Sequence, residues 1–211
     1  MRGLQNAKQL IERSSDLVPA ATLDAIAVEP AIPQRVYPTG MILTLGAILM
    51  FFTALISAFV VRRGLSTSPL EGPIGLPWRL LGLNTGLLLA SSGALEASRR
   101  SLRSGETAKF RTWWYAATGL GLAFLIGQLA AWRVLAGQGT YLASNPNASF
   151  FYLFTGAHAL HLIGGIIALL VIALRPLRRL TQSTATRIAA MYWHFLTIVW
   201  AGIFLLLIFA K

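Results

Sequence analysis

Long apolar stretches separated by short polar connections make up most of the chain. A helix needs about 20 apolar residues to cross the hydrocarbon core of a bilayer. Five stretches approach this length, at about 38–61, 79–98, 112–136, 150–174 and 188–210. The pattern predicts an all-α fold, a polytopic membrane bundle of five transmembrane helices within residues 38–211. Residues 1–37 are polar to mildly amphipathic and are expected to form an N-terminal cytoplasmic arm.

The fourth stretch, 150–174, has no charged residue, yet its first half holds two histidines and a threonine among several glycines. A helix that faced only lipid would not need these groups. Polar side chains inside membranes usually turn toward other helices, and glycines let neighbouring backbones approach closely. This stretch is therefore expected to be a packed, inward-facing helix.

The second stretch, 79–98, is the weakest candidate by hydropathy. Such a segment is costly against lipid and tolerated when neighbouring helices surround it. Glu96 lies near a membrane edge and is expected to reach the interface or to pair with an arginine of the predicted loop 99–111. The polar residues of this stretch are Asn84, Thr85, Ser91, Ser92 and Glu96.

The third stretch, 112–136, carries aromatic residues toward both ends. Trp113, Trp114 and Tyr115 lie at one end and Trp132 lies near the other. Tryptophan and tyrosine are enriched at membrane–water interfaces. The spacing predicts that these residues form interfacial belts.

The charge distribution predicts how the bundle is oriented. Only 12% of the residues are charged, against about 25% in soluble domains. The net charge of +11 therefore does not indicate nucleic-acid binding. With five spans, 13 of the 18 basic residues fall on the side of the arm. The positive-inside rule then predicts an inner (plasma) membrane protein with its N-terminus in the cytoplasm and its C-terminus outside.

Three histidines are the candidate chemical groups, and the chain has no cysteine. His158 and His161 share one helix face, because they are three residues apart. Imidazole suggests either a haem or metal site or interhelical hydrogen bonding. Helical rise places His161 and His194 at depths that differ by roughly 10 Å. This mismatch disfavours a haem held between the fourth and fifth spans, and we favour structural histidines.

The remaining polar residues are expected to connect helices. Leucine at Gly156 or Gly165 is predicted to damage assembly by wedging helices apart. Arginines that follow the fourth span, namely Arg175, Arg178, Arg179 and Arg187, either meet anionic lipid head groups or only set the topology. The predicted polar seam, at which helices pack, consists of Asn84, Gln128, Thr155, Gly156, His158, His161, Gly165 and His194.

Five motifs in order resemble subunit III of haem–copper oxidases (cytochrome c or quinol oxidase subunit 3), in its five-span bacterial form. They are Phe-Phe-Thr-Ala-Leu-Ile-Ser-Ala-Phe-Val-Val-Arg-Arg at 51–63, Leu-Pro-Trp at 76–78 with Leu-Asn-Thr-Gly-Leu-Leu-Leu-Ala-Ser-Ser at 83–92, Gln128 with Trp132, Phe-Thr-Gly-Ala-His-Ala-Leu-His-Leu-Ile-Gly-Gly at 154–165, and Tyr-Trp-His-Phe-Leu-Thr-Ile-Val-Trp at 192–200. Two positions depart from the family pattern, because Ile48 and Thr197 stand where many members carry an acidic residue.

The resemblance implies a non-catalytic accessory subunit, with no catalytic, cofactor or metal site of its own. Haem and copper would lie in partner subunits, and oxygen reduction to water and proton pumping would belong to the complex. The implied partners are catalytic subunit I, the other oxidase subunits and membrane phospholipid. Three alternatives remain: a membrane cytochrome b using His158 or His161 with His194, a similar partner of a nitric oxide reductase, and a small transporter.

Overall fold

A computed structural model describes residues 36–65, 75–141, 146–174 and 184–209. The chain divides into two compact units, Met1–Val36 and Tyr37–Lys211, and the described helices belong almost wholly to the second. The predicted arm lies almost wholly outside the described residues. So do Arg175, Arg178 and Arg179.

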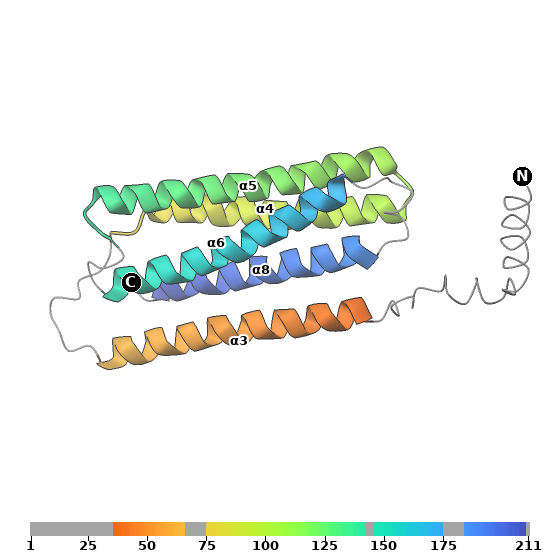
Figure 1. Ribbon diagram of the computed structural model, residues 1–211. Helices are drawn as coiled ribbons and strands as arrows, with labels where there is room; N and C mark the ends of the chain where they lie inside the picture. Colours follow the sequence, from red (N-terminus) through yellow and green to blue (C-terminus); the bar gives the residue numbers. More distant parts are fainter. Residues whose placement is uncertain (1–35, 66–74, 142–145, 175–183, 210–211) are drawn as a thin grey trace, which may run out of the picture. The chain divides into compact units, whose positions relative to one another are not determined.

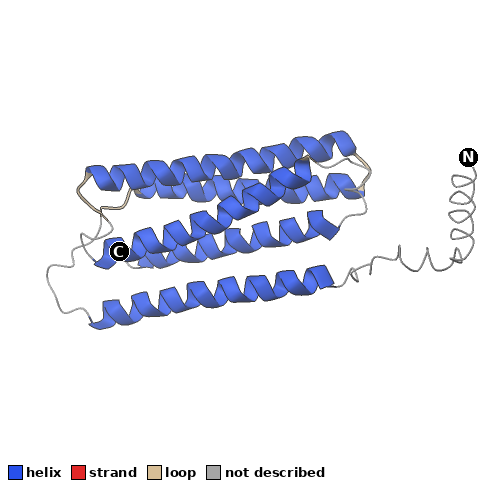
Figure 2. Ribbon diagram, in the orientation of Figure 1, coloured by secondary structure: helices blue, strands red, loops and turns tan. Residues whose placement is uncertain are grey.

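The described part of the chain is helical except for a few residues next to the helix ends, so the all-α prediction is confirmed (Figures 1 and 2). Each predicted span corresponds to one helix. The helices are α3 (Val36–Leu65), α4 (Trp78–Arg103), α5 (Thr107–Gly137), α6 (Pro146–Ala173) and α8 (Thr184–Phe209).

The predicted loop at 99–111 is wrong, because most of it is helical. Only Ser104, Gly105 and Glu106 separate α4 from α5. Gly105 has φ 78° and donates its N–H to Leu102, while the N–H of Glu106 reaches the carbonyl of Ser101. This glycine-dependent end motif stops the helix within three residues. The basic residues of the segment therefore lie on helix ends.

Four of the five helices are long and apolar enough to cross a membrane: Pro38–Leu65, Thr107–Gly137, Pro146–Ala173 and Thr184–Phe209. The chain is a multi-pass membrane protein. Helix α4 is not among these four. This agrees with the weak hydropathy of the second predicted stretch, 79–98, which lies within α4. Its buried positions explain why, since leucines and small polar residues alternate along one face with a seven-residue repeat: Leu81, Asn84, Leu88, Ser91, Leu95 and Ser98.

Helices α4 and α5 pack antiparallel along their lengths. The Ser98 hydroxyl donates to the carbonyl of Phe110 at 2.9 Å, and Ser91 donates to Ala117 at 2.7 Å. Further along, the Asn84 amide lies against Gly127. Small residues at these contacts let the two backbones approach, which is how membrane helices pack closely. Helix α4 thus lies beside a helix that can span the bilayer.

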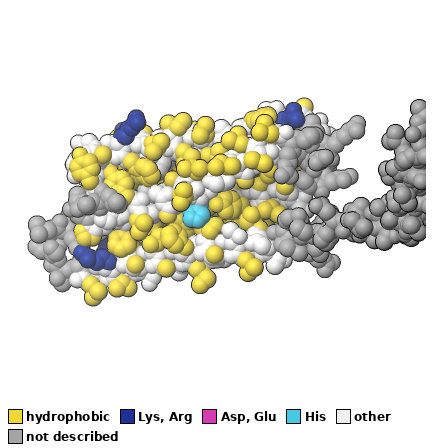
Figure 3. All heavy atoms as spheres, viewed as in Figure 1, with side chains coloured by type: hydrophobic (Ala, Val, Ile, Leu, Met, Phe, Trp, Pro, Cys, Tyr) yellow, Lys and Arg dark blue, Asp and Glu magenta, His cyan; other side chains and the backbone are white. Residues whose placement is uncertain are grey.

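Two apolar clusters hold the helices together. The first joins α4, α5, α6 and α8 around Trp114, Phe124 and Trp193. The second brings in α3, whose Phe59 contacts Phe150 and Phe154 of α6 with ring centroids 5.4 and 5.9 Å apart. Figure 3 shows apolar side chains spread over the visible face and Lys and Arg only toward its ends, as expected for a lipid-facing surface.

Candidate functional site

Indole and phenol groups donate several of the side-chain hydrogen bonds between the described helices. The indole N–H of Trp114 donates from α5 to the carbonyl of Leu169 in α6 at 3.0 Å. From α8, the Tyr192 hydroxyl donates to the carbonyl of His161 at 3.0 Å. These bonds connect the helices at several levels.

Two tryptophans of α8 donate to hydroxyls of α4. Trp193 donates to Ser91 at 3.1 Å, and Trp200 donates to Thr85 at 3.0 Å. Ser91 also bonds to a third helix, because its own hydroxyl donates to the carbonyl of Ala117 in α5. The polar residues that make α4 weak by hydropathy are therefore the acceptors that α8 uses.

The predicted aromatic belts are only partly right. Trp113 and Tyr115 are exposed, as a belt requires, but Trp114 is only 1% exposed and belongs to the core. Trp132 is half-buried and donates to Thr155 of α6 at 3.0 Å. Interface composition alone did not distinguish an indole that faces lipid from one that connects two helices.

His158 lies fully buried in the bundle core. Its ring packs against Phe124 of α5 and Trp200 of α8, with centroids 5.9 and 5.1 Å away. Neither ring nitrogen has a hydrogen-bond partner.

His161 faces a different neighbour from His158, although both are on α6. Its ring lies 5.8 Å from Phe52 and 6.3 Å from Phe51 of α3, centroid to centroid. Its Nδ1 is 2.8 Å from the carbonyl of Ala157 in its own helix. Phe51 and Phe52, from the motif at 51–63, therefore contact His161, from the motif at 154–165.

His194 belongs to a polar cluster between α8 and α4. Its Nδ1 lies 2.6 Å from the Ser92 hydroxyl, and its Nε2 lies 3.8 Å from a Glu96 oxygen. Glu96 also accepts from Arg99 at 2.9 Å and lies 3.6 Å from Arg100. The predicted pairing of Glu96 with an arginine is confirmed, with partners on the same helix.

The rings of the three histidines face different helices: His158 faces α5 and α8, His161 faces α3, and His194 faces α4. A haem held by two histidines needs both rings directed at one iron. Among the described residues, no group of three or more His, Cys, Asp or Glu side chains could hold a metal ion.

The glycines of the predicted seam differ in what surrounds them. A Cβ at Gly165 would lie 3.1 Å from the Trp193 ring and 3.2 Å from Tyr192, whereas one at Gly156 would meet nothing within 4 Å. Two glycines of α5 that the sequence interpretation missed are tighter still. A Cβ at Gly121 would lie 2.6 Å from Trp193, and one at Gly127 would overlap the Asn84 amide.

The small residues that precede Gly121 at helical spacing, such as Ala117, were the available signal for this close packing. Small residues indicate close packing only if it is known which residue of α8 faces them. The local sequence pattern does not contain that information. Three other residues of the predicted seam, Asn84, Gln128 and Thr155, are buried.

The two positions that depart from the family pattern are buried without charge. Ile48 of α3 is part of the second apolar cluster. The Thr197 hydroxyl donates to the carbonyl of Trp193 one turn earlier, at 3.0 Å.

Arg187, the one described member of the predicted lipid set, is exposed in the first turn of α8.

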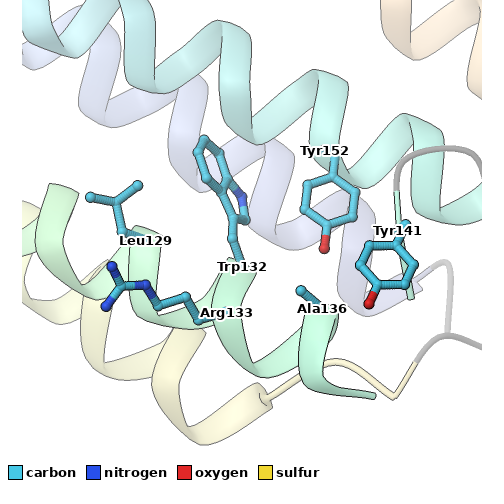
Figure 4. A pocket seen from close by; sticks show the side chains of 6 residues that line it. All are labelled: Leu129, Trp132, Arg133, Ala136, Tyr141 and Tyr152. Carbon is cyan, nitrogen blue, oxygen red and sulfur yellow. The ribbon is translucent and has the colours of Figure 1, made fainter. Parts of the chain in front are cut away.

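A pocket of about 350 Å³ lies where α5 ends and α6 begins (Figure 4). Leu129, Trp132, Ala136 and two tyrosines line it, and the Tyr152 hydroxyl donates to the carbonyl of Thr140 at 2.9 Å. Arg133 also lines the pocket, but its guanidinium points away from both tyrosines. The pocket does not bring together a set of reactive groups.

Comparison with known proteins agrees with the five motifs. A family model described as cytochrome c oxidase subunit III matches residues 15–210. A probable cytochrome c oxidase subunit 3 of Nocardia farcinica is 33% identical over 194 residues, covering 86% of this chain and 95% of that protein. The corresponding protein of Corynebacterium diphtheriae is 31% identical over 197 residues, with 86% and 95% covered. One from Synechocystis sp. is 30% identical over 172 residues, with 79% and 72% covered.

The family match covers all five helices of the structure, including α4 with its polar face. It also covers the residues that connect the helices, from Thr85 to Trp200. The similarity is therefore one of the whole bundle and not of one motif. The chain belongs to the cytochrome c oxidase subunit III family.

Proposed function

We propose that this chain is the non-catalytic subunit III of a respiratory haem–copper oxidase and that it supports catalytic subunit I in the membrane. Haem and copper are held by partner subunits, and oxygen reduction and proton translocation are activities of the complex. By family, the partners of the chain are other oxidase subunits.

One observation carries the proposal beyond family membership: many of the polar side chains that the structure describes connect helices. Trp193 and Trp200 donate to α4, Trp114 donates to α6, and His194 is engaged by Ser92 and Glu96. A membrane cytochrome b that used these histidines would instead direct two imidazoles at one iron. The histidines of this bundle diverge.

Purification from native membranes tests this role. The chain, carrying a C-terminal affinity tag, is extracted in a mild detergent and captured, with untagged membranes as the control. We expect a haem-bearing partner in the eluate, with a Soret band and consumption of oxygen. Recovery of the chain as a stable oligomer with no haem-bearing partner would contradict the proposal. A partner that reduces nitric oxide and not oxygen would assign the chain to the related reductase.

We further propose that the N-terminus lies in the cytoplasm and that Arg187 meets anionic phospholipid on that side. The exposed guanidinium in the first turn of α8 supports this, because basic side chains at the cytoplasmic surface attract anionic head groups. Mass spectrometry of lipids retained by the purified complex tests it. Arg187→Gln should lower the retained anionic phospholipid, while Arg133→Gln, at the opposite end of the helices, should not. Equal retention in both variants would refute this lipid contact.

A further inference from the structure

Among the residues that the structure describes, three buried side chains have no hydrogen-bond partner. They are Asn84 of α4, Gln128 of α5 and His158 of α6, and both polar atoms of each are unpaired. Each is at most 1% exposed. The remaining buried polar residues of the described ranges are all engaged, for instance Ser91 and Ser98 with α5 carbonyls and Thr197 with its own helix.

A closed circuit of contacts through neighbouring residues connects the positions of the three side chains. The Asn84 amide lies against Gly127, the neighbour of Gln128. One turn earlier on α5, Phe124 contacts the rings of both His158 and Trp200.

Trp200 closes the circuit. Its ring lies 5.1 Å from His158, and its indole N–H donates to Thr85, the neighbour of Asn84. The circuit therefore passes from α4 to α8, α6, α5 and back to α4, and the unpaired groups belong to three of these four helices.

Gln128 and His158 lie far from the ends of their helices. By a rise of ~1.5 Å per residue, Gln128 lies about 14 Å from the end of α5 and His158 about 18 Å from the start of α6. At that depth lipid offers no hydrogen-bond partner, and unpaired polar groups in hydrocarbon are strongly unfavourable. A partner must come from within the bundle.

We propose that Asn84, Gln128 and His158 form an internal hydration site, in which ordered water bridges the three side chains and connects α4, α5 and α6. Each amide offers an acceptor oxygen and a donor nitrogen, and a neutral imidazole offers one of each. Water both donates and accepts, and a buried water typically makes about three hydrogen bonds to such otherwise unsatisfied groups.

Direct bonds alone would satisfy this set poorly. The two nitrogens of His158 lie on different edges of its ring, and Phe124 and Trp200 pack against that ring. Gly127 lets the Asn84 amide reach the α5 backbone because it has no side chain. A small bridging molecule can bond to polar groups on three helices at once. The site lies wholly within this chain, so it does not depend on the proposed function.

A high-resolution density map of the unmodified protein, in the complex in which it is purified, tests the proposal directly. We expect density for water within about 2.7–3.2 Å of polar atoms from at least two of the three side chains. The proposal is overturned if the side chains are resolved and bond directly to one another, or if no such density lies between them.

Apolar replacements of similar shape test whether the three side chains act as one unit. Asn84→Leu, Gln128→Met and His158→Phe should each lower the melting midpoint by roughly 2–4 °C, because each leaves the other groups and their water incompletely bonded. The triple variant should melt no lower than the worst single variant, since it removes the whole site. Additive losses would overturn the proposal.

Thr197→Val supplies the matched control. Thr197 is buried, but its hydroxyl bonds within its own helix. Combined with Gln128→Met, it should give additive shifts, because the two sites share no partner. If the Asn84, Gln128 or His158 variants do not accumulate, the map of the unmodified protein decides.

Discussion

At Gly121 the missing side chain sets the distance between α5 and α8. A Cβ there would lie 2.6 Å from two atoms of the Trp193 ring, and that ring is itself fixed by its bond to Ser91. The indole cannot withdraw without losing its acceptor. A Cβ at Gly119, on the same helix, would have no neighbour within 4 Å.

These two glycines make a matched pair for a stability measurement. Gly121→Ala should destabilise the protein by about 1–3 kcal/mol, the usual cost of overpacking a core. Gly119→Ala should be neutral or slightly stabilising, because alanine favours helix. Thermal melting of the purified protein in detergent measures both, and equal midpoints would show that this contact is loose.

Gly165 and Gly156 form a second pair on α6. Gly165→Leu should reduce the yield of folded protein, because Trp193 and Tyr192 already lie close to its backbone. Gly156→Leu should leave the yield of the chain unchanged, since nothing in the described chain faces it within 4 Å. Size-exclusion profiles of the two variants compare them. A loss confined to Gly156→Leu would show that this face packs against something outside the chain.

Ser91 accepts from one helix and donates to another, so its removal should affect both contacts. Ser91→Ala leaves the Trp193 indole N–H buried without an acceptor, which costs about 1–3 kcal/mol. Ser101→Ala is the control, because that half-buried hydroxyl bonds only to Ala97 of its own helix. Similar melting midpoints for the two variants would contradict a connecting role for Ser91.

Sequence reasoning at the residue scale identified buried polar residues but not their partners. Asn84, Gln128 and His158 were assigned to a seam from residue type and span alone, and their burial agrees with that assignment. Trp114 was placed at an interface, although it donates to α6 from the core. Which residue of another helix lies opposite is a property of packing, which local pattern does not encode.

At the scale of elements, α4 is the helix whose character depends most on its neighbours. Its polar face is accommodated because α5 and α8 supply the partners. Hydropathy along the sequence averages over both faces of a helix. It therefore underestimates how well α4 is suited to the membrane interior when α5 and α8 cover its polar face. The positions of the five helices followed from the apolar pattern, but the helix end at Arg103 depended on a glycine turn that the sequence interpretation treated as loop.

Cysteine labelling tests whether α4 crosses the membrane. The chain has no native cysteine, so single cysteines report without background. If α3 and α4 both span the bilayer, Thr39→Cys and Ser104→Cys should react with an impermeant reagent from the same side, and Thr140→Cys from the other. The turn at Ser104 joins α4 to α5. Reaction of Thr39→Cys and Ser104→Cys from opposite sides would mean that α4 does not cross.

At the scale of the whole molecule, the described residues combine many exposed apolar side chains with an interior in which several polar side chains connect helices. Family membership links such a bundle to a larger oxidase. Its three histidines are divided among three packing contacts. Under the proposed function, redox chemistry belongs to partner chains.

The absorption spectrum of this polypeptide, separated from its partners in detergent, tests that assignment most directly. The polar groups of the bundle are proposed to hold helices together and to bind no pigment, so the isolated chain should show no Soret band while the intact complex shows one. A Soret band that stays with the isolated chain and is lost in His194→Ala would contradict this assignment and make the chain a cytochrome.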